Sequence, residues 1–354
     1  MTIKSRRKAV PGRRGRFLLI LCLCTIGLSA SSAFPAVYAA KDTRVTVTQA
    51  VSHNALASLA IKTQPSTESL QDFTKLTIRK LSADAPFTSW KEARTDYYPL
   101  GPGTHSWLVN IMDGEQRIGY LIVSATEQGG YMLSEYGTGT SGLPYSLTDL
   151  RQFLVQEELI TSDYSGKLEL TALYASLLPV WKLTLDHTDI YINASVPQVL
   201  PWSSDKAEEV LKVQLDGVNT FSGLDSNWSP LQTYRSEGLD DPYADLQWLT
   251  SPKLKLDSAE NFTVLLNQSG SLVFQSAGRN DTTGAPFMIT GYQRWLPAGS
   301  SGKTSGSSPA IVYAAAGPKG KRYLPLSALQ QSGTLHQLPL AGKTVIGALT
   351  TSKR

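Results

Sequence analysis

The sequence predicts an α+β protein, in which tandem modules of a helix plus an antiparallel meander precede a small β-rich α+β domain. Two observations predict the meanders. Strand-like stretches are rich in β-branched and aromatic residues, and the tight-turn dipeptides Asp113-Gly114 and Gly129-Gly130 separate them. A third observation predicts the helices, because apolar residues recur at helical spacing ahead of each group of strands.

The first module, residues 41–140, is expected to begin with two helices. Residues 48–62 carry one apolar stripe that Pro65 ends, and residues 67–81 form the second helix. The apolar face of the second helix consists of Leu70, Phe73, Leu76 and Ile78. The period then changes to that of strands, which are expected at 106–112, 118–125 and 131–136.

The second module, residues 141–200, repeats this pattern without repeating its residues. Ser146 or Thr148 is expected to cap a helix that runs to Leu159, because Ser and Thr oxygens accept the free N–H groups of a first turn. The inward residues of this helix are Leu150, Phe153, Leu154 and Leu159. Strands are expected at 168–176, 180–185 and 190–196.

Residues 201–255 are predicted to be a loop-rich connector. Ser, Asp, Pro, Gly and aromatic residues alternate there without a clear period. Two breaks, Asp240-Asp241-Pro242 and Ser251-Pro252, interrupt the stretch further.

The C-terminal domain, residues 256–354, is expected to be β-rich. Asp257 or Ser258 caps a short helix that runs to Leu266. Strands are expected at 271–275, 286–295, 309–315 and 321–325. The other expected elements are a hairpin tip in the Gly/Ser-rich stretch 297–308 and a helix at 326–331 that stops at Gly333.

The first 40 residues have the order of a secretory signal peptide. Residues 1–16 carry seven Lys or Arg side chains and no acidic one, residues 17–30 are uncharged and apolar, and small residues follow. Cleavage after Ala39 would release a secreted or extracytoplasmic protein. The alternative is an uncleaved membrane anchor, because residues 17–40 contain no charge and are long enough to span a bilayer of about 30 Å.

Composition limits the classes of function that the exported chain can have. The chain has 33 basic and 29 acidic side chains, and removal of the seven basic ones in the leader leaves a net charge of −3. Nucleic acid is therefore not an expected partner. Both cysteines, Cys22 and Cys24, lie in the leader. The cleaved chain would therefore have no disulfide and no thiol nucleophile.

The strand motifs of the two modules resemble known envelope modules. Gly119–Ala125, followed by Gly130–Tyr136, resembles the meander in propeptide domains of secreted cysteine peptidases. Pro179–Leu185, followed by Tyr191–Asn193, is similar to PepSY-type modules of secreted Gram-positive proteins. That resemblance implies a module that binds or restrains a peptidase, or that acts in the cell envelope.

The C-terminal region resembles the late strands of papain-like peptidases of the bacteriocin-processing type. The similar stretches are Met288–Tyr292 and Arg322–Leu329, with Tyr313 between them. In that family a catalytic His stands just before the first of these strands, where this chain has Ala285, Pro286 and Phe287. The catalytic Cys is also absent, so the resemblance implies a degenerate copy that does not run the family's reaction.

No complete catalytic or metal-binding pattern is present in the sequence. The four histidines are His53, His105, His187 and His336, and no Gly-x-Ser-x-Gly motif presents a serine nucleophile. There is also no His-x-x-x-His pair and no complete calcium loop. No catalytic residue, metal or cofactor is therefore expected.

A ligand-binding site is expected in the acidic, aromatic stretch 225–250. Asp240, Asp241 and Asp245 would supply carboxylates there, and Trp248 an aromatic ring that stacks on a sugar or peptide. Two other interpretations of these residues are a solvated acidic loop and an aromatic residue that holds the loop to the core.

The sequence thus favours an exported, non-catalytic cell-envelope protein that binds or restrains a protein or peptide partner. Its expected surface is the exposed edge of a meander, to which a partner strand adds. One alternative is a hydrolase of unrecognised type with its site in 225–250. Another is an envelope structural protein.

Overall fold

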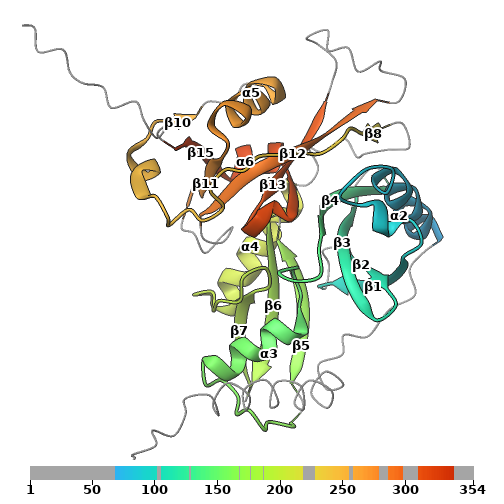
Figure 1. Cartoon of the computed structure of the whole chain (residues 1–354). Coiled ribbons are helices and arrows are strands. Elements are labelled where there is room, and N and C mark those ends of the chain that lie inside the picture. The colour runs from blue at the N-terminus through green and yellow to red at the C-terminus, as the bar shows by residue number, and fades with distance from the viewer. Residues whose placement is uncertain are drawn as a thin grey trace, which may run out of the picture. The chain divides into compact units, whose positions relative to one another are not determined.

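The computed structural model describes residues 68–338, except 102–104, 127–128, 167, 176, 186, 218–227, 255–257, 279–285 and 298–309. Helices and antiparallel strands are mixed over these residues, which confirms the α+β class (Figure 1). The leader, the helix expected over 48–62 and the hairpin tip expected over 297–308, apart from Pro297, lie outside the described residues. Of the helices described, none is long and apolar enough to cross a bilayer.

Helix α2 (Glu68–Leu81) confirms the second expected helix. Its buried residues are Leu70, Thr74, Thr77, Ile78 and Leu81. The buried stripe is displaced from the expected one, since Phe73 and Leu76 are only half-buried. A threonine is accommodated on the buried side because Thr77 Oγ1 donates to the Phe73 carbonyl at 2.8 Å, which satisfies the hydroxyl.

An antiparallel meander follows α2. The strands β2 (Ser106–Asp113), β3 (Gln116–Ala125) and β4 (Tyr131–Thr138) confirm the three expected ones, and each pairs with its neighbour in the chain. The sequence pattern missed β1 (Arg94–Leu100), which pairs with β2 and lies at one end of the sheet. Its Pro99 interrupts a strand pattern but is tolerated at an edge, where one side of the strand carries no ladder.

The meander strands and the C-terminal strands form one twelve-stranded sheet. β4 pairs with β14 (Arg322–Pro325), and Tyr136 lies opposite Tyr323 at this joint. The order continues through β13 (Ile311–Ala316), β12 (Phe287–Pro297), β11 (Leu272–Ser276), β15 (Gly333–Gln337) and β10 (Lys253–Leu254). Two short strands, β8 (Trp228–Pro230) and β9 (Tyr234–Arg235), also pair with β12. The strands β11 to β14 were expected, whereas β8, β9, β10 and β15 were not.

A second sheet of three strands is formed by β5 (Glu169–Ala175), β6 (Leu178–Leu185) and β7 (Thr188–Asn193), as the sequence predicts. Helix α3 (Leu147–Gln156) precedes it. The predicted cap is confirmed at Ser146, whose Oγ accepts the Asp149 N–H at 3.2 Å.

Three further helices complete the described fold. Helix α4 (Ser204–Gly217) lies within the expected connector, where no helix was predicted. Helix α5 (Ala259–Ser269) confirms the expected cap, since Ser258 Oγ accepts the Asn261 N–H at 3.2 Å. Helix α6 (Leu326–Ser332) ends at Gly333, as expected.

Aromatic rings fill the core beside the joint of β4 and β14. The buried rings are Phe87, Trp90, Tyr136, Trp295, Tyr313 and Tyr323. Tyr136 and Tyr323 stack with their centroids 4.8 Å apart and their planes 4° from parallel. Gly119 on β3 is required here, because a Cβ at that position would overlap the Trp90 ring.

Candidate functional site

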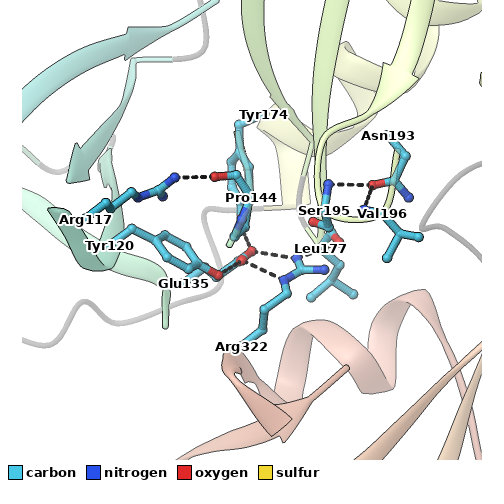
Figure 2. A network of polar contacts seen from close by, with 10 residues as sticks. All are labelled: Arg117, Tyr120, Glu135, Pro144, Tyr174, Leu177, Asn193, Ser195, Val196 and Arg322. Atoms are coloured by element: carbon cyan, nitrogen blue, oxygen red, sulfur yellow. Dashed lines mark hydrogen bonds and ion pairs between the residues drawn. The ribbon is translucent and has the colours of Figure 1, made fainter. Parts of the chain in front are cut away.

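A buried ion pair joins β4 to β14 (Figure 2). Arg322 donates from Nε to Glu135 Oε1 at 2.9 Å and from Nη2 to Oε2 at 3.0 Å. The Glu135 side chain is fully buried, and 12% of the Arg322 side chain is exposed. Two parallel N–H···O bonds are the arrangement in which arginine binds a carboxylate most strongly.

Further hydrogen bonds connect this ion pair to neighbouring strands and loops. The Tyr120 hydroxyl on β3 donates to Glu135 Oε1 at 2.5 Å, and the Tyr174 hydroxyl on β5 donates to Oε2 at 3.4 Å. Arg322 Nη2 further donates to the Leu177 carbonyl at 3.2 Å. Groups from both sheets therefore meet at one carboxylate. We call this set of residues the polar junction.

Burial and charge act together on the groups of the polar junction. Burial and the Glu135 carboxylate raise the pKa of Tyr120 and of Tyr174 well above 10. Burial alone lowers the pKa of Arg322, but the attraction of Glu135 outweighs it, so this pKa is raised. The hydroxyls thus stay protonated and donate, and the guanidinium stays charged. The junction is therefore suited to holding the two sheets together.

Arg117 extends the polar contacts on the β3 side of the junction. Its Nη1 donates to the Pro144 carbonyl at 2.6 Å (Figure 2), and its guanidinium lies 5.3 Å from the centroid of the Tyr120 ring. Burial lowers the pKa of Arg117 to about 10.

The predicted ligand residues lie in the segment 236–250, which we call the apolar loop. Asp241 Oδ1 accepts the Tyr243 N–H at 2.9 Å, and Asp245 Oδ1 accepts the Gln247 N–H at 2.9 Å. Asp240 Oδ2 accepts the Lys319 N–H at 3.2 Å. Each carboxylate thus has its own backbone partner, and Asp245 caps the 3₁₀ helix η3 (Leu246–Thr250).

Trp248 anchors the apolar loop to the sheet beneath it. Only 2% of the residue is exposed, and its Nε1 donates to the Pro242 carbonyl at 2.7 Å. The ring packs with Val273 and Met288, and its centroid lies 5.7 Å from that of His336. The Trp248 ring is therefore buried in the protein core and does not face solvent.

The start of the apolar loop is fixed as well. Ser236 Oγ donates to the carbonyls of Gly270 and Thr290, the second at 2.9 Å. A Cβ at Gly238 would overlap the Gly270 carbonyl, so the backbone of the loop passes directly over the end of α5. The loop is therefore held at its start, at its carboxylates and at Trp248.

This well-held loop exposes four large apolar side chains. Leu239, Tyr243, Leu246 and Leu249 are 49%, 59%, 52% and 54% exposed. They make up half of the exposed large apolar residues in the described parts of the chain. Leu246 and Leu249 are three residues apart on η3, a spacing that stacks their side chains on one face of a 3₁₀ helix. Grouped exposed apolar residues mark interaction surfaces, whereas scattered ones are ordinary.

The structure brings the four predicted site residues into one short loop but not to one point. Within the described residues, no group of three His, Cys, Asp or Glu side chains is placed to hold a metal. Sequence reasoning missed the leucines of the loop, because their exposure depends on the fold. It also missed Glu135 and Arg322, although a charged residue within an apolar strand pattern can indicate a buried ion pair.

No protein-family model matches the chain, and no match is found among the curated proteins or the solved structures. The resemblances drawn from the sequence therefore stay predictions.

His336 beneath the apolar loop is expected to make stability depend on pH. Burial lowers its pKa from 6.5, and nearby Lys253 acts in the same direction, while a hydrogen bond to the Ser251 backbone opposes them. As the pH falls below about 6.5, the unfolded chain binds a proton that the folded chain resists, so the free energy of unfolding falls. Urea denaturation between neutral and mildly acid pH measures this.

The matched variants for this pH prediction are His336→Gln and His187→Gln. The first removes the buried imidazole and is expected to flatten part of the pH dependence, whereas the second changes an exposed histidine and should leave it intact. Identical pH profiles for the wild type and His336→Gln would contradict the prediction.

Proposed function

We propose that the protein is an exported, non-catalytic cell-envelope protein that binds or restrains a protein or peptide partner through the apolar loop. The observation that carries this proposal is the exposure of Leu239, Tyr243, Leu246 and Leu249 on a backbone fixed by hydrogen bonds and by Trp248. A loop that is already ordered loses little conformational entropy when it binds. Export, with cleavage or with anchoring by residues 17–40, rests on the leader.

Binding is favoured over catalysis by how the carboxylates of the loop are used. Asp240, Asp241 and Asp245 each accept a backbone N–H, and these bonds order the loop. The hydrolase and the envelope structural protein stay alternatives, and neither has a specific observation in its favour.

The modular organisation belongs to the same proposal. Helix α2 precedes the meander of β1 to β4, and helix α3 precedes that of β5 to β7, which supports tandem helix–meander modules. Strand β1 is a candidate for the predicted meander edge to which a partner strand would add, because it lies at the end of the large sheet. The apolar loop is nevertheless the surface with the stronger support.

The double variant Leu246→Ser/Leu249→Ser tests the proposal. Loss of two exposed anchors is expected to weaken partner binding by at least about thirtyfold, since a single interface hot spot contributes about 2 kcal/mol or more. The free energy of unfolding should change by no more than about 0.5 kcal/mol per residue, because both side chains are exposed. Crosslinked pull-down from an envelope extract, then binding to the purified partner, measures the effect.

Val264→Ser is the matched control for this experiment. Val264 lies on α5 and is 51% exposed, so the change is similar but outside the loop. Equal binding of the wild type, the control and the loop variant would contradict the proposal.

A further inference from the structure

We propose that the partner segment seated on the apolar loop is cationic as well as apolar, namely an amphipathic segment rich in Lys or Arg. This inference rests on the proposed function and adds the chemistry of the partner to it. The evidence is the distribution of charge among the exposed apolar side chains.

The charges interspersed among these side chains are all negative. Residues 236–252 contain no Lys, Arg or His, and their acidic residues are Glu237, Asp240, Asp241 and Asp245. Glu237, Asp240 and Asp241 are exposed, and Asp245 is half-buried. A partner that covers the leucines therefore comes close to several carboxylates. Without cations on the partner, these charges would be desolvated and unpaired.

Among the described residues, Arg235, Lys253 and Lys319 are cations that adjoin the loop in the chain or contact it. Arg235 precedes it, but its guanidinium donates to the Lys319 carbonyl and to the Tyr323 hydroxyl, and lies over the Tyr323 ring. Lys253 follows the loop, and the exposed Lys319 approaches it through a backbone N–H. Arg235 and Lys253 flank the loop in the chain, whereas Asp240, Asp241 and Asp245 lie between Leu239 and Leu249.

The carboxylates that order the loop keep the capacity to bind a cation. The bonds to backbone N–H groups use Oδ1 of Asp241, Oδ1 of Asp245 and Oδ2 of Asp240. A carboxylate has two oxygens and about four acceptor positions, so one such bond leaves its charge and other acceptor positions. The loop therefore presents negative charge at fixed positions beside its apolar side chains.

The same charges favour a protein segment over a lipid surface. Segments that lie in a membrane interface carry Lys and Arg beside their apolar residues, because they are attracted to anionic lipids. The apolar loop has the opposite sign of charge. A cationic amphipathic segment of a protein matches both its charge and its apolar side chains.

Three synthetic peptides of one helical pattern test the inference on the full-length chain. All three place Leu on one face, and the other face carries Lys, Gln or Glu. The Lys peptide is expected to bind about tenfold more tightly than the Gln peptide and the Glu peptide more weakly, because several exposed charge pairs contribute modestly each. Added salt should reduce these differences. Isothermal titration measures the three affinities.

The quadruple variant Glu237→Gln/Asp240→Asn/Asp241→Asn/Asp245→Asn removes the four negative charges of the loop. Asn keeps an oxygen that accepts the same backbone N–H, so the loop retains its caps. The preference for the Lys peptide over the Gln peptide is expected to disappear in this variant. It should persist in the control Asp205→Asn, which changes an exposed acidic residue at the start of α4.

The outcomes separate this inference from the proposed function. Equal affinity for the Lys and Gln peptides, with both lost in Leu246→Ser/Leu249→Ser, would overturn the cationic partner and leave the proposed function standing. If both loop variants bind the peptides as the wild type does, the result would overturn the cationic partner and the proposed function together. Binding to vesicles of phosphatidylcholine and phosphatidylglycerol that depends on the loop leucines would overturn the protein partner in favour of lipid.

Discussion

Replacement of Glu135 by alanine is expected to lower the free energy of unfolding by about 3–5 kcal/mol, because a buried charge is left without its partner. Arg322 would lose both bonds to the carboxylate, and the hydroxyls of Tyr120 and Tyr174 would lose their acceptor. Urea denaturation followed by far-UV circular dichroism measures the change.

The control for this prediction is an ion pair near the surface. Asp189 pairs with Lys182 at 2.8 Å, and about a quarter to a third of each side chain is exposed. Asp189→Ala is expected to cost at most about 1 kcal/mol. The double variant Glu135→Leu/Arg322→Met should recover much of the loss, since it leaves no unpaired charge. A cost for Glu135→Ala no larger than that for Asp189→Ala would show that the polar junction does not hold the sheets together.

Trp248→Ala is expected to be the most damaging change within the apolar loop. It removes the large buried ring that packs with Val273 and Met288, together with the hydrogen bond to the Pro242 carbonyl. Truncation of a buried Trp costs about 3–5 kcal/mol. The loop should also lose hydrogen-exchange protection and partner binding together, because its exposed side chains depend on this anchor.

Leu249→Ala is the matched control for the anchor, since Leu249 is next to Trp248 but 54% exposed. Its effect on the free energy of unfolding is expected to stay within about 0.5 kcal/mol, although it should weaken partner binding. A Trp248→Ala protein with wild-type stability and wild-type exchange in the loop would contradict the assignment of Trp248 as the anchor.

Local pattern predicts many of the described elements but not how they pair. The caps at Ser146 and Ser258 were predicted, as was the meander turn at Gly114. The pairing of β4 with β14 was not predicted, because Glu135 and Arg322 are 187 residues apart and no local signal links them. Tertiary packing decides such long-range pairings.

Helix α4 is a different kind of miss, because its signal was present in the sequence. Ser203 Oγ accepts the Lys206 N–H at 3.2 Å, and Ala207 and Val210 are buried at helical spacing. The surrounding Pro, Gly and aromatic residues hid this period.

Asp240, Asp241, Asp245 and Trp248 were predicted as ligand-binding residues, and that role stays a prediction. The four residues from Asp240 to Trp248 do lie in one short, ordered loop. Their local roles as caps and anchor depend on backbone geometry. The exposure of Leu246 and Leu249 depends on which side of the loop faces the sheet. The sequence gives no signal that distinguishes a buried leucine from an exposed one, so only the fold shows which leucines are exposed.

Site-specific photocrosslinking in the producing cells tests the central claim, that the apolar loop binds a partner, most directly. A photoreactive phenylalanine derivative replaces Leu246 in one variant and Val264 in another, two positions of nearly equal exposure. One dominant protein adduct is predicted from position 246 and none from position 264. The same adducts from both positions, or none from position 246 in cells that contain the folded protein, would contradict the claim.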